Sequence, residues 1–150
     1  MKFADFEEGM VAEVGPIQVS AQEILEFAKR YDPQWFHTDL DASAEGPYGG
    51  LIASGWQTCG LAMRLSVDHF LKGSESFGSP GLAYLKWLAP VRPNDALTLR
   101  ATVLEKRHSS KNPSLGVLRW RWQMRNQQNI EVLDLEATSL FDLKPNARVG

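Results

Sequence analysis

The chain has 150 residues, 43% of them apolar and 23% charged, a composition that suits one globular domain with a substantial core and excludes two domains of ordinary size. Its formal net charge of −2 disfavours nucleic acid and anionic membranes as partners, and its one cysteine excludes an intrachain disulfide bond and a zinc site of several cysteines. No apolar run approaches the roughly 20 residues of a membrane span, so we expect a single domain over residues 1–150 that binds neither membrane nor metal.

The first third of the chain predicts an edge strand and then a capped helix. Residues 1–9 are polar and include acidic side chains where a signal peptide would be apolar, so the expected location is the cytoplasm. Residues 10–19 predict an irregular strand at a sheet edge, because the proline within it donates no ladder hydrogen bond. Ser20 and Glu23 form a capping box for a helix that should end at Asp32, since the residue before a proline avoids helical dihedrals.

The connection after this helix predicts mostly irregular structure. Residues 33–38 are expected to form a loop that carries two aromatic side chains and a histidine. Asp39 is placed to cap a short helical turn that ends near Ala44, and glycines then break the chain before residue 51.

The longest predicted helix runs from Gly55 to Lys72, about 27 Å at ~1.5 Å per residue. Ser54 is placed to cap its start, and Gly73 stands where a left-handed residue ends a helix. Apolar side chains recur at spacings of three and four, at Trp56, Cys59, Met63, Val67 and Phe70. Because other apolar residues widen this surface, we expect the helix to be buried on most sides, with a sheet wrapped around it.

The second half of the chain predicts four strands joined by short connections. A loop of small residues over 74–79 should precede strands over 82–89 and 96–107, a third strand ending near residue 125, and a last one over 130–143. In the third, Trp120, Trp122 and Met124 should face the helix, while three interleaved arginines (119, 121 and 125) should be solvated, with a phosphate contact as the alternative. Short connections imply antiparallel neighbours, so the chain predicts an α+β fold.

Asp32 and His37 are the first candidates for chemistry. A carboxylate and an imidazole are the common pair for positioning and deprotonating water, and these two lie five residues apart on the connection toward the long helix. The alternative is that Asp32 only ends the first helix and that His37 is a surface residue.

Gly55, directly after Ser54, is the second candidate. The free backbone N–H groups at a helix N-terminus favour negative charge, and a glycine lets a ligand oxygen approach them closely. The alternative is that Gly55 lets the helix pack tightly against a neighbouring element.

Three segments together are similar to the landmarks of the MaoC-like dehydratases, which include the (R)-specific enoyl-CoA hydratases. They are Tyr31–His37 (YDPQWFH), Gly50–Trp56 (GLIASGW) and Pro90–Asp95 (PVRPND). The resemblance covers about residues 8–142 in the family's order and spacing. It implies the hot-dog fold, in which a curled antiparallel sheet of five to six strands wraps around one long helix. It also implies a homodimer, or a higher oligomer, whose sheets join edge to edge.

The resemblance further implies a hydratase or dehydratase of fatty acid metabolism that acts on 2-enoyl and 3-hydroxyacyl thioesters. Coenzyme A or acyl carrier protein would be part of the substrate, and no other cofactor is expected. By similarity, Asp32 and His37 hold the reacting water, and the Gly55 backbone N–H binds the thioester oxygen.

Four more residues are expected around the substrate: Gln34, Trp35, Ser54 and Trp56, with core packing as the alternative for the two tryptophans. Gln34 and Trp35 stand where the hydratases have asparagine and proline, and Ser54 stands where they commonly have histidine. Two other functions use the same fold. One is a hot-dog thioesterase, in which a carboxylate activates water for attack on the carbonyl carbon, and the other is a non-catalytic module that binds acyl thioesters.

Overall fold

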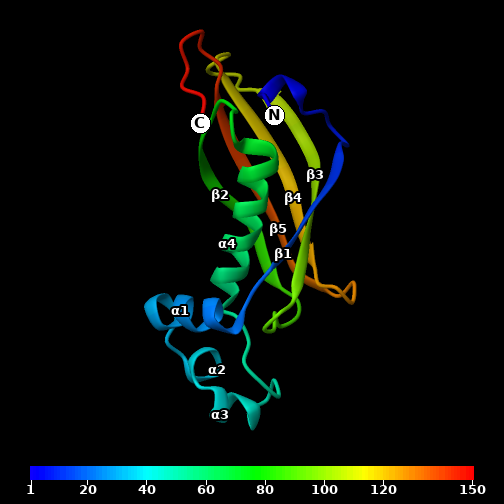
Figure 1. Cartoon of the computed structure of the whole chain (residues 1–150). Coiled ribbons are helices and arrows are strands. Elements are labelled where there is room, and N and C mark those ends of the chain that lie inside the picture. Colours follow the sequence, from blue (N-terminus) through cyan, green and yellow to red (C-terminus); the bar gives the residue numbers. More distant parts are fainter.

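Five antiparallel strands curl around one long helix in the computed structural model, which describes residues 1–150 (Figure 1). The strands are β1 (Val11–Gln18), β2 (Ser76–Trp87), β3 (Ala96–His108), β4 (Leu115–Arg125) and β5 (Glu131–Asp142). Their order across the sheet is β1-β3-β4-β5-β2, and each neighbouring pair is antiparallel. The α+β hot-dog arrangement is therefore confirmed with five strands, and β1 lies at an edge as its proline predicts.

The helical elements are η1 (Phe3–Asp5), α1 (Ala21–Tyr31), α2 (Trp35–Thr38), α3 (Leu40–Ala44), α4 (Gly55–Ser66) and the π-helical turn η2 (Val67–Leu71). Together α4 and η2 make the predicted long helix, which ends within a residue of the expected position. Gly73 then has a φ of +76°, the left-handed conformation that glycine adopts without strain. None of these helices is both long and apolar enough to cross a lipid bilayer.

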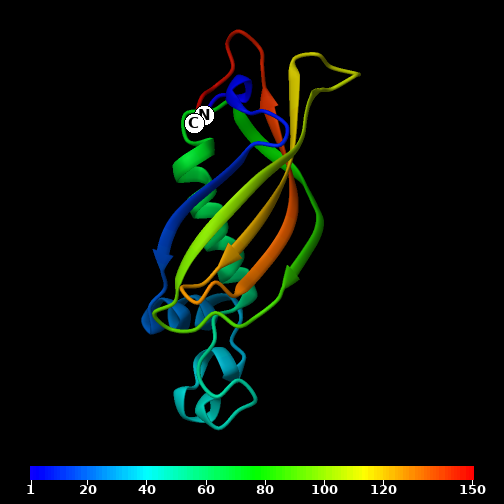
Figure 2. The same cartoon turned by 90° about the vertical axis from the view of Figure 1, so that its right-hand side faces the viewer.

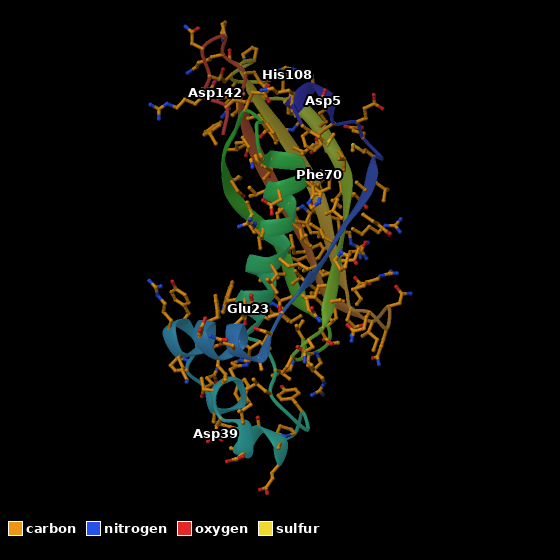
Figure 3. All side chains as sticks on the ribbon, in the orientation of Figure 1. Asp5, Glu23, Asp39, Phe70, His108 and Asp142 are labelled. Carbon is orange, nitrogen blue, oxygen red and sulfur yellow. The ribbon has the colours of Figure 1, made fainter.

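The core lies between the helix and the inner face of the sheet. Trp120, Trp122 and Met124 are buried there as predicted, and the Phe70 ring meets the Trp120 ring edge-on at 5.9 Å between centroids. Figure 3 shows Phe70 among the strands, at the end of the helix far from Asp39. The prediction that the helix is buried on most sides is wrong: 60% of Trp56 and 44% of Met63 are exposed, because the sheet covers only one face of α4.

Two expected loops are regular structure. Residues 76–79 belong to β2, where Ser76 and Gly78 pair with Phe141 and Leu140 of β5. Small residues are accepted there because β5 supplies the backbone partners and nothing packs on the outer edge. Residues 35–38 form the short helix α2, since the segment folds back on itself before Asp39 caps α3 through the Ala42 N–H.

The outer face of the sheet carries ion pairs rather than free arginines. Arg121 donates from Nε and Nη2 to the two carboxylate oxygens of Asp134 at 2.9 and 2.7 Å, and Tyr84 donates its hydroxyl to the same carboxylate. Arg119 lies within 3.6 Å of carboxylate oxygens of Glu105 and Glu136. The arginines are solvated as expected, since 47% of the Arg119 side chain and 41% of the Arg121 side chain are exposed, and acidic partners from neighbouring strands pair with them.

The segment from α1 to α3 lies beyond one end of the sheet, beside the N-terminal end of α4 (Figures 1 and 2). Its first helix begins at the predicted capping box, in which Ser20 Oγ accepts from the Glu23 N–H and the Glu23 carboxylate accepts from the Ser20 N–H. This placement brings the residues after α1 to the start of α4.

Candidate active site

A cleft of about 450 Å³ opens where the α1–α3 segment, the start of α4 and the end of β2 meet. Asp32, Gln34 and His37 supply most of its polar wall. The apolar wall includes four aromatic residues: Phe36, Tyr48, Trp56 and Trp87. All three sequence landmarks therefore contribute to one cavity, because Pro90 and Val91 of the third landmark line it as well.

The third landmark, Pro90–Asp95, positions the segment that leads into α4. The Val91 carbonyl accepts from the Ala53 N–H at 2.8 Å, two residues before Gly55. The buried Asp95 carboxylate accepts from the Arg92 N–H at 2.9 Å and so closes the turn. This turn thus fixes where the helix begins.

Asp32 and His37 lie side by side in the cleft. The Nε2 atom of His37 is 3.3 Å from Oδ2 of Asp32, and the imidazole is buried. The other ring nitrogen, Nδ1, is 2.7 Å from the carbonyl oxygen of Ile52. Because a carbonyl oxygen only accepts, Nδ1 carries a hydrogen, and in the neutral imidazole Nε2 is the free acceptor.

Both oxygens of the Asp32 carboxylate accept hydrogen bonds. Gln34 donates from Nε2 to Oδ1 at 2.7 Å, and Ser54 donates its hydroxyl to Oδ2 at 2.7 Å. These two bonds, that from Gln34 first, hold the pKa of the Asp32 carboxyl below its usual value, against the opposing effect of burial. The cleft therefore contains a carboxylate that is kept ionised beside an imidazole.

The side chains of Ser54 and Gln34 thus both contact Asp32. Ser54 is fully buried and is absent from the cleft wall, and its hydroxyl makes no capping bond to the helix. The predicted cap is therefore wrong, because the hydroxyl is directed at the Asp32 carboxylate, to which it donates, and its oxygen accepts from no N–H of the first helical turn. Gln34 lines the cleft as well as bonding Asp32.

Gly55 begins α4 and is covered by the indole of Trp87. A Cβ atom added to Gly55 would lie 2.6 Å from Nε1 and 2.7 Å from Cδ2 of that ring, so only glycine fits. The structure therefore supports the packing interpretation of this glycine. The backbone N–H groups of Gly55 and Trp56 still donate to no other group of the protein, as is usual in the first helical turn.

The two remaining sequence candidates differ in position. Trp56 lines the cleft beside Trp87, with 5.2 Å between the ring centroids and an edge-on contact. Trp35 does not line the cleft; its ring packs on Gly46, where a Cβ would lie 2.8 Å from the indole. The structure therefore favours the packing alternative for Trp35, and its contact with a substrate stays a prediction.

Trp87 is the cleft residue that sequence reasoning missed. Its sequence signal is weak, since it lies inside the strand predicted over 82–89, three residues before the Pro90–Asp95 landmark. No group of three or more His, Cys, Asp or Glu side chains in the chain is close enough to hold a metal ion.

Comparisons with known proteins bear on the family and the fold of this chain. The sequence model of the MaoC like domain matches residues 4–118. The crystal structure of a MaoC-like dehydratase from Rhodospirillum rubrum superposes with a TM-score of 0.86, at 32% identity, over 95% of this chain and 97% of that one. Uncharacterized protein YdeM of Bacillus subtilis is 30% identical over 141 residues, 94% of this chain and 99% of its own length.

A shorter match concerns a protein whose name states a reaction. The 3-hydroxyacyl-thioester dehydratase Z of Mycobacterium tuberculosis is 34% identical over 77 residues, which are 50% of this chain and 51% of that protein.

Proposed function

This chain belongs to the MaoC-like dehydratase family, and on that premise we propose that it adds water to 2-enoyl thioesters, or removes water from 3-hydroxyacyl thioesters. One observation carries the proposal: the Asp32–His37 pair and the unpaired N–H of Gly55 border the same cleft. Hydration requires a water at C3, a proton at C2, and stabilisation of the negative charge that develops on the thioester oxygen. The cleft holds one group suited to each need.

His37 is the group that we assign to proton transfer. A water placed between His37 and Asp32 would donate one hydrogen to Nε2 and the other to the carboxylate, leaving its lone pair toward C3. Imidazole accepts a proton near neutral pH more readily than a carboxylate that already accepts two hydrogen bonds. When the water oxygen bonds to C3, Nε2 takes the proton and Asp32 stabilises the imidazolium. The same Nε2–H then delivers that proton to C2, and the imidazole is neutral again.

Gly55 supplies the oxyanion donor in this proposal. Its N–H lies at the positive end of the α4 dipole, and no protein group competes for it. One preorganised donor of this kind lowers a reaction barrier by roughly 3–4 kcal/mol in a site that excludes water. The aromatic wall of the cleft, with Phe36 and Trp56, favours that exclusion.

The cleft wall also favours an uncharged acyl group. No lysine or arginine lines it, and the anionic Asp32 would repel a second carboxylate on the substrate. Apolar enoyl groups carried on coenzyme A or acyl carrier protein are the substrates that we propose.

A homodimer is the assembly that we propose for this enzyme. The outer edge of β2 has no neighbouring strand, and Phe77 and Leu82 of β2 are 61% and 48% exposed. Leu82 is paired with the buried Ala137, so it lies on the inner face of the sheet, where α4 leaves it uncovered. Pairing of two β2 edges would cover these side chains and would satisfy the free backbone groups of both strands.

A panel of 2-enoyl-CoA thioesters tests the reaction. Enoyl absorbance and free thiol are followed together after the purified protein is added. Loss of the enoyl signal without release of thiol is the expected result. Thiol release would instead identify a thioesterase, and tight binding with neither change would identify a non-catalytic binding module.

A further inference from the structure

We propose that Trp87 is a positioning residue that holds the oxyanion donor of Gly55 in place, an inference that rests on the function proposed above. Trp87 ends β2, whereas Gly55 begins α4, so the contact joins the sheet to the start of the helix. Nothing in the reaction itself requires a tryptophan there, because the indole does not reach Asp32 or His37 by any hydrogen bond.

The indole makes two different contacts with Gly55. The face of its ring covers the Cα atom, since Nε1 and Cδ2 are almost equally distant from the position of an added Cβ, at 2.6 and 2.7 Å. The Nε1–H group also donates to the Gly55 carbonyl oxygen at 2.9 Å. One contact restrains the Cα atom, and the other restrains the peptide plane that follows it.

Trp87 is itself restrained by contacts with β5 and with Trp56. Its backbone is in register with Leu133 of β5, a fully buried residue, and the next residue, Leu88, donates its N–H to the Val132 carbonyl. The ring edge-on contact with Trp56 restrains the indole from the helix side. The sheet therefore fixes the backbone of Trp87, and its ring, although Trp87 is 46% exposed, is restrained by Trp56 and by its hydrogen bond to Gly55.

Such a restraint matters most at a glycine. A glycine has the widest backbone freedom of any residue, and the first residue of a helix lacks a hydrogen bond on its own N–H. A catalytic donor has to stay within about 0.5 Å of its productive position. Without the indole, the Gly55 N–H would still exist but would be aimed less precisely at the thioester oxygen.

The test separates the orientation of the Gly55 N–H from effects on folding and on substrate binding. Trp87→Phe keeps an aromatic ring over Gly55 but removes the N–H donor. The probe is butanoyl-CoA with carbon-13 at its carbonyl, a saturated thioester that cannot be hydrated. Infrared difference spectra of the bound probe report how strongly its carbonyl is polarised. Trp122→Phe is the matched control, because Trp122 lies outside the cleft and its Nε1 has no hydrogen-bond partner.

The wild-type protein and the Trp122→Phe control should lower the carbonyl stretching frequency of the bound probe equally. In Trp87→Phe the frequency should return part of the way to that of the free probe, although the probe still binds. With a 2-enoyl-CoA substrate, kcat should fall about tenfold, a part of the 10²–10³-fold effect of losing one oxyanion donor, while KM changes less than about threefold.

Three results would overturn the inference, and they can be told apart. Full retention of the wild-type frequency and kcat in Trp87→Phe would remove the role of Trp87 and leave the proposed function intact. Loss of probe binding in this variant would make Trp87 a binding residue instead. A wild-type band at the frequency of the free probe would remove the oxyanion role of Gly55 from the proposed function, and the role of Trp87 with it.

Discussion

The carboxylate of Asp32 accepts one hydrogen bond on each oxygen, from Gln34 and from Ser54, and His37 lies against the second oxygen. The Ile52 carbonyl holds the imidazole from the opposite side. At the scale of the residue, the site is therefore a chain of polar groups in which each member fixes the next. The proton acceptor at its end, Nε2 of His37, is the atom that the reaction needs free.

Replacing either member of the pair tests this arrangement directly. Asp32→Asn and His37→Ala should each lower kcat by about 10²–10⁴-fold, because each removes a group that activates the water. Circular dichroism and the elution volume should match the wild-type protein. Asp41→Asn and His69→Ala, at exposed positions outside the cleft, are the controls and should retain activity. Wild-type turnover in both site variants would refute the assignment.

The pH dependence tests the hydroxyl of Ser54. A hydrogen bond to the ionised carboxyl lowers its pKa, so Ser54→Ala should raise the pKa of Asp32 toward the ordinary value. The titration midpoint of the Asp32 carboxyl, followed by carbon-13 NMR of the labelled side chain, should therefore move to higher pH in the variant.

Ser66→Ala is the control for this titration, since the Ser66 hydroxyl is buried on the same helix without a partner. Its Asp32 midpoint should coincide with that of the wild-type protein. An unchanged midpoint in Ser54→Ala would mean that the Ser54 hydroxyl does not stabilise the ionised carboxyl.

At the scale of the elements, the contact of α4 with β2 decides the shape of the cleft. The helix begins where the Trp87 ring meets a residue without a side chain, so the two elements approach more closely than any larger residue would permit. The exposed side of α4, which carries Met63, is not covered by the sheet of its own chain. One helix thus has a packed face and a face left for other contacts.

Gly55→Ala should test how tightly these elements meet. The added methyl group would overlap the indole, and overpacking of this kind costs about 1–3 kcal/mol of unfolding free energy. Combining Gly55→Ala with Trp87→Ala should recover part of this loss, because the second change removes the ring. Urea denaturation of the two single variants and the double variant gives the coupling energy. Strictly additive free energies would contradict direct contact between the two residues.

At the scale of the whole molecule, the sheet has two edges of different character. Both edge strands contain bulges, one in β1 between Val14 and Ile17 and three in β2, so bulges do not distinguish the two edges. The β2 edge is longer and carries exposed apolar side chains. The second edge is therefore the one that we expect a partner copy to cover.

Leu82→Asp should weaken the proposed dimer, because it would place a carboxylate in an apolar contact. We expect the dissociation constant to rise at least about tenfold. Burying a charge without a partner costs more than the roughly 1.4 kcal/mol that a tenfold change represents. Sedimentation at several concentrations should show wild-type particles of twice the 16.8 kDa chain mass and mostly single chains for the variant. Leu104→Asp, at an exposed position on β3, is the control. Wild-type protein that sediments as single chains would contradict the proposal.

The sequence by itself determined the features that depend on neighbours close in the chain. The capping box at Ser20 sets the start of α1, the cap at Asp39 sets α3, and the alternation through Trp120 and Trp122 sets the inward face of β4. These interactions join residues two to four positions apart, so their pattern is legible before folding. The three landmarks likewise indicated the family and the Asp32–His37 pair.

Only the tertiary structure decided which distant groups meet. The Ser54 hydroxyl bonds a carboxylate 22 residues away instead of capping its own helix, and the Trp87 indole, 32 residues away, occupies the space above Gly55. The small residues at the start of β2 become a strand because β5 lies beside them. In each case a local preference is outweighed by a partner that only the folded chain brings within reach, and no periodicity in the sequence records that partner.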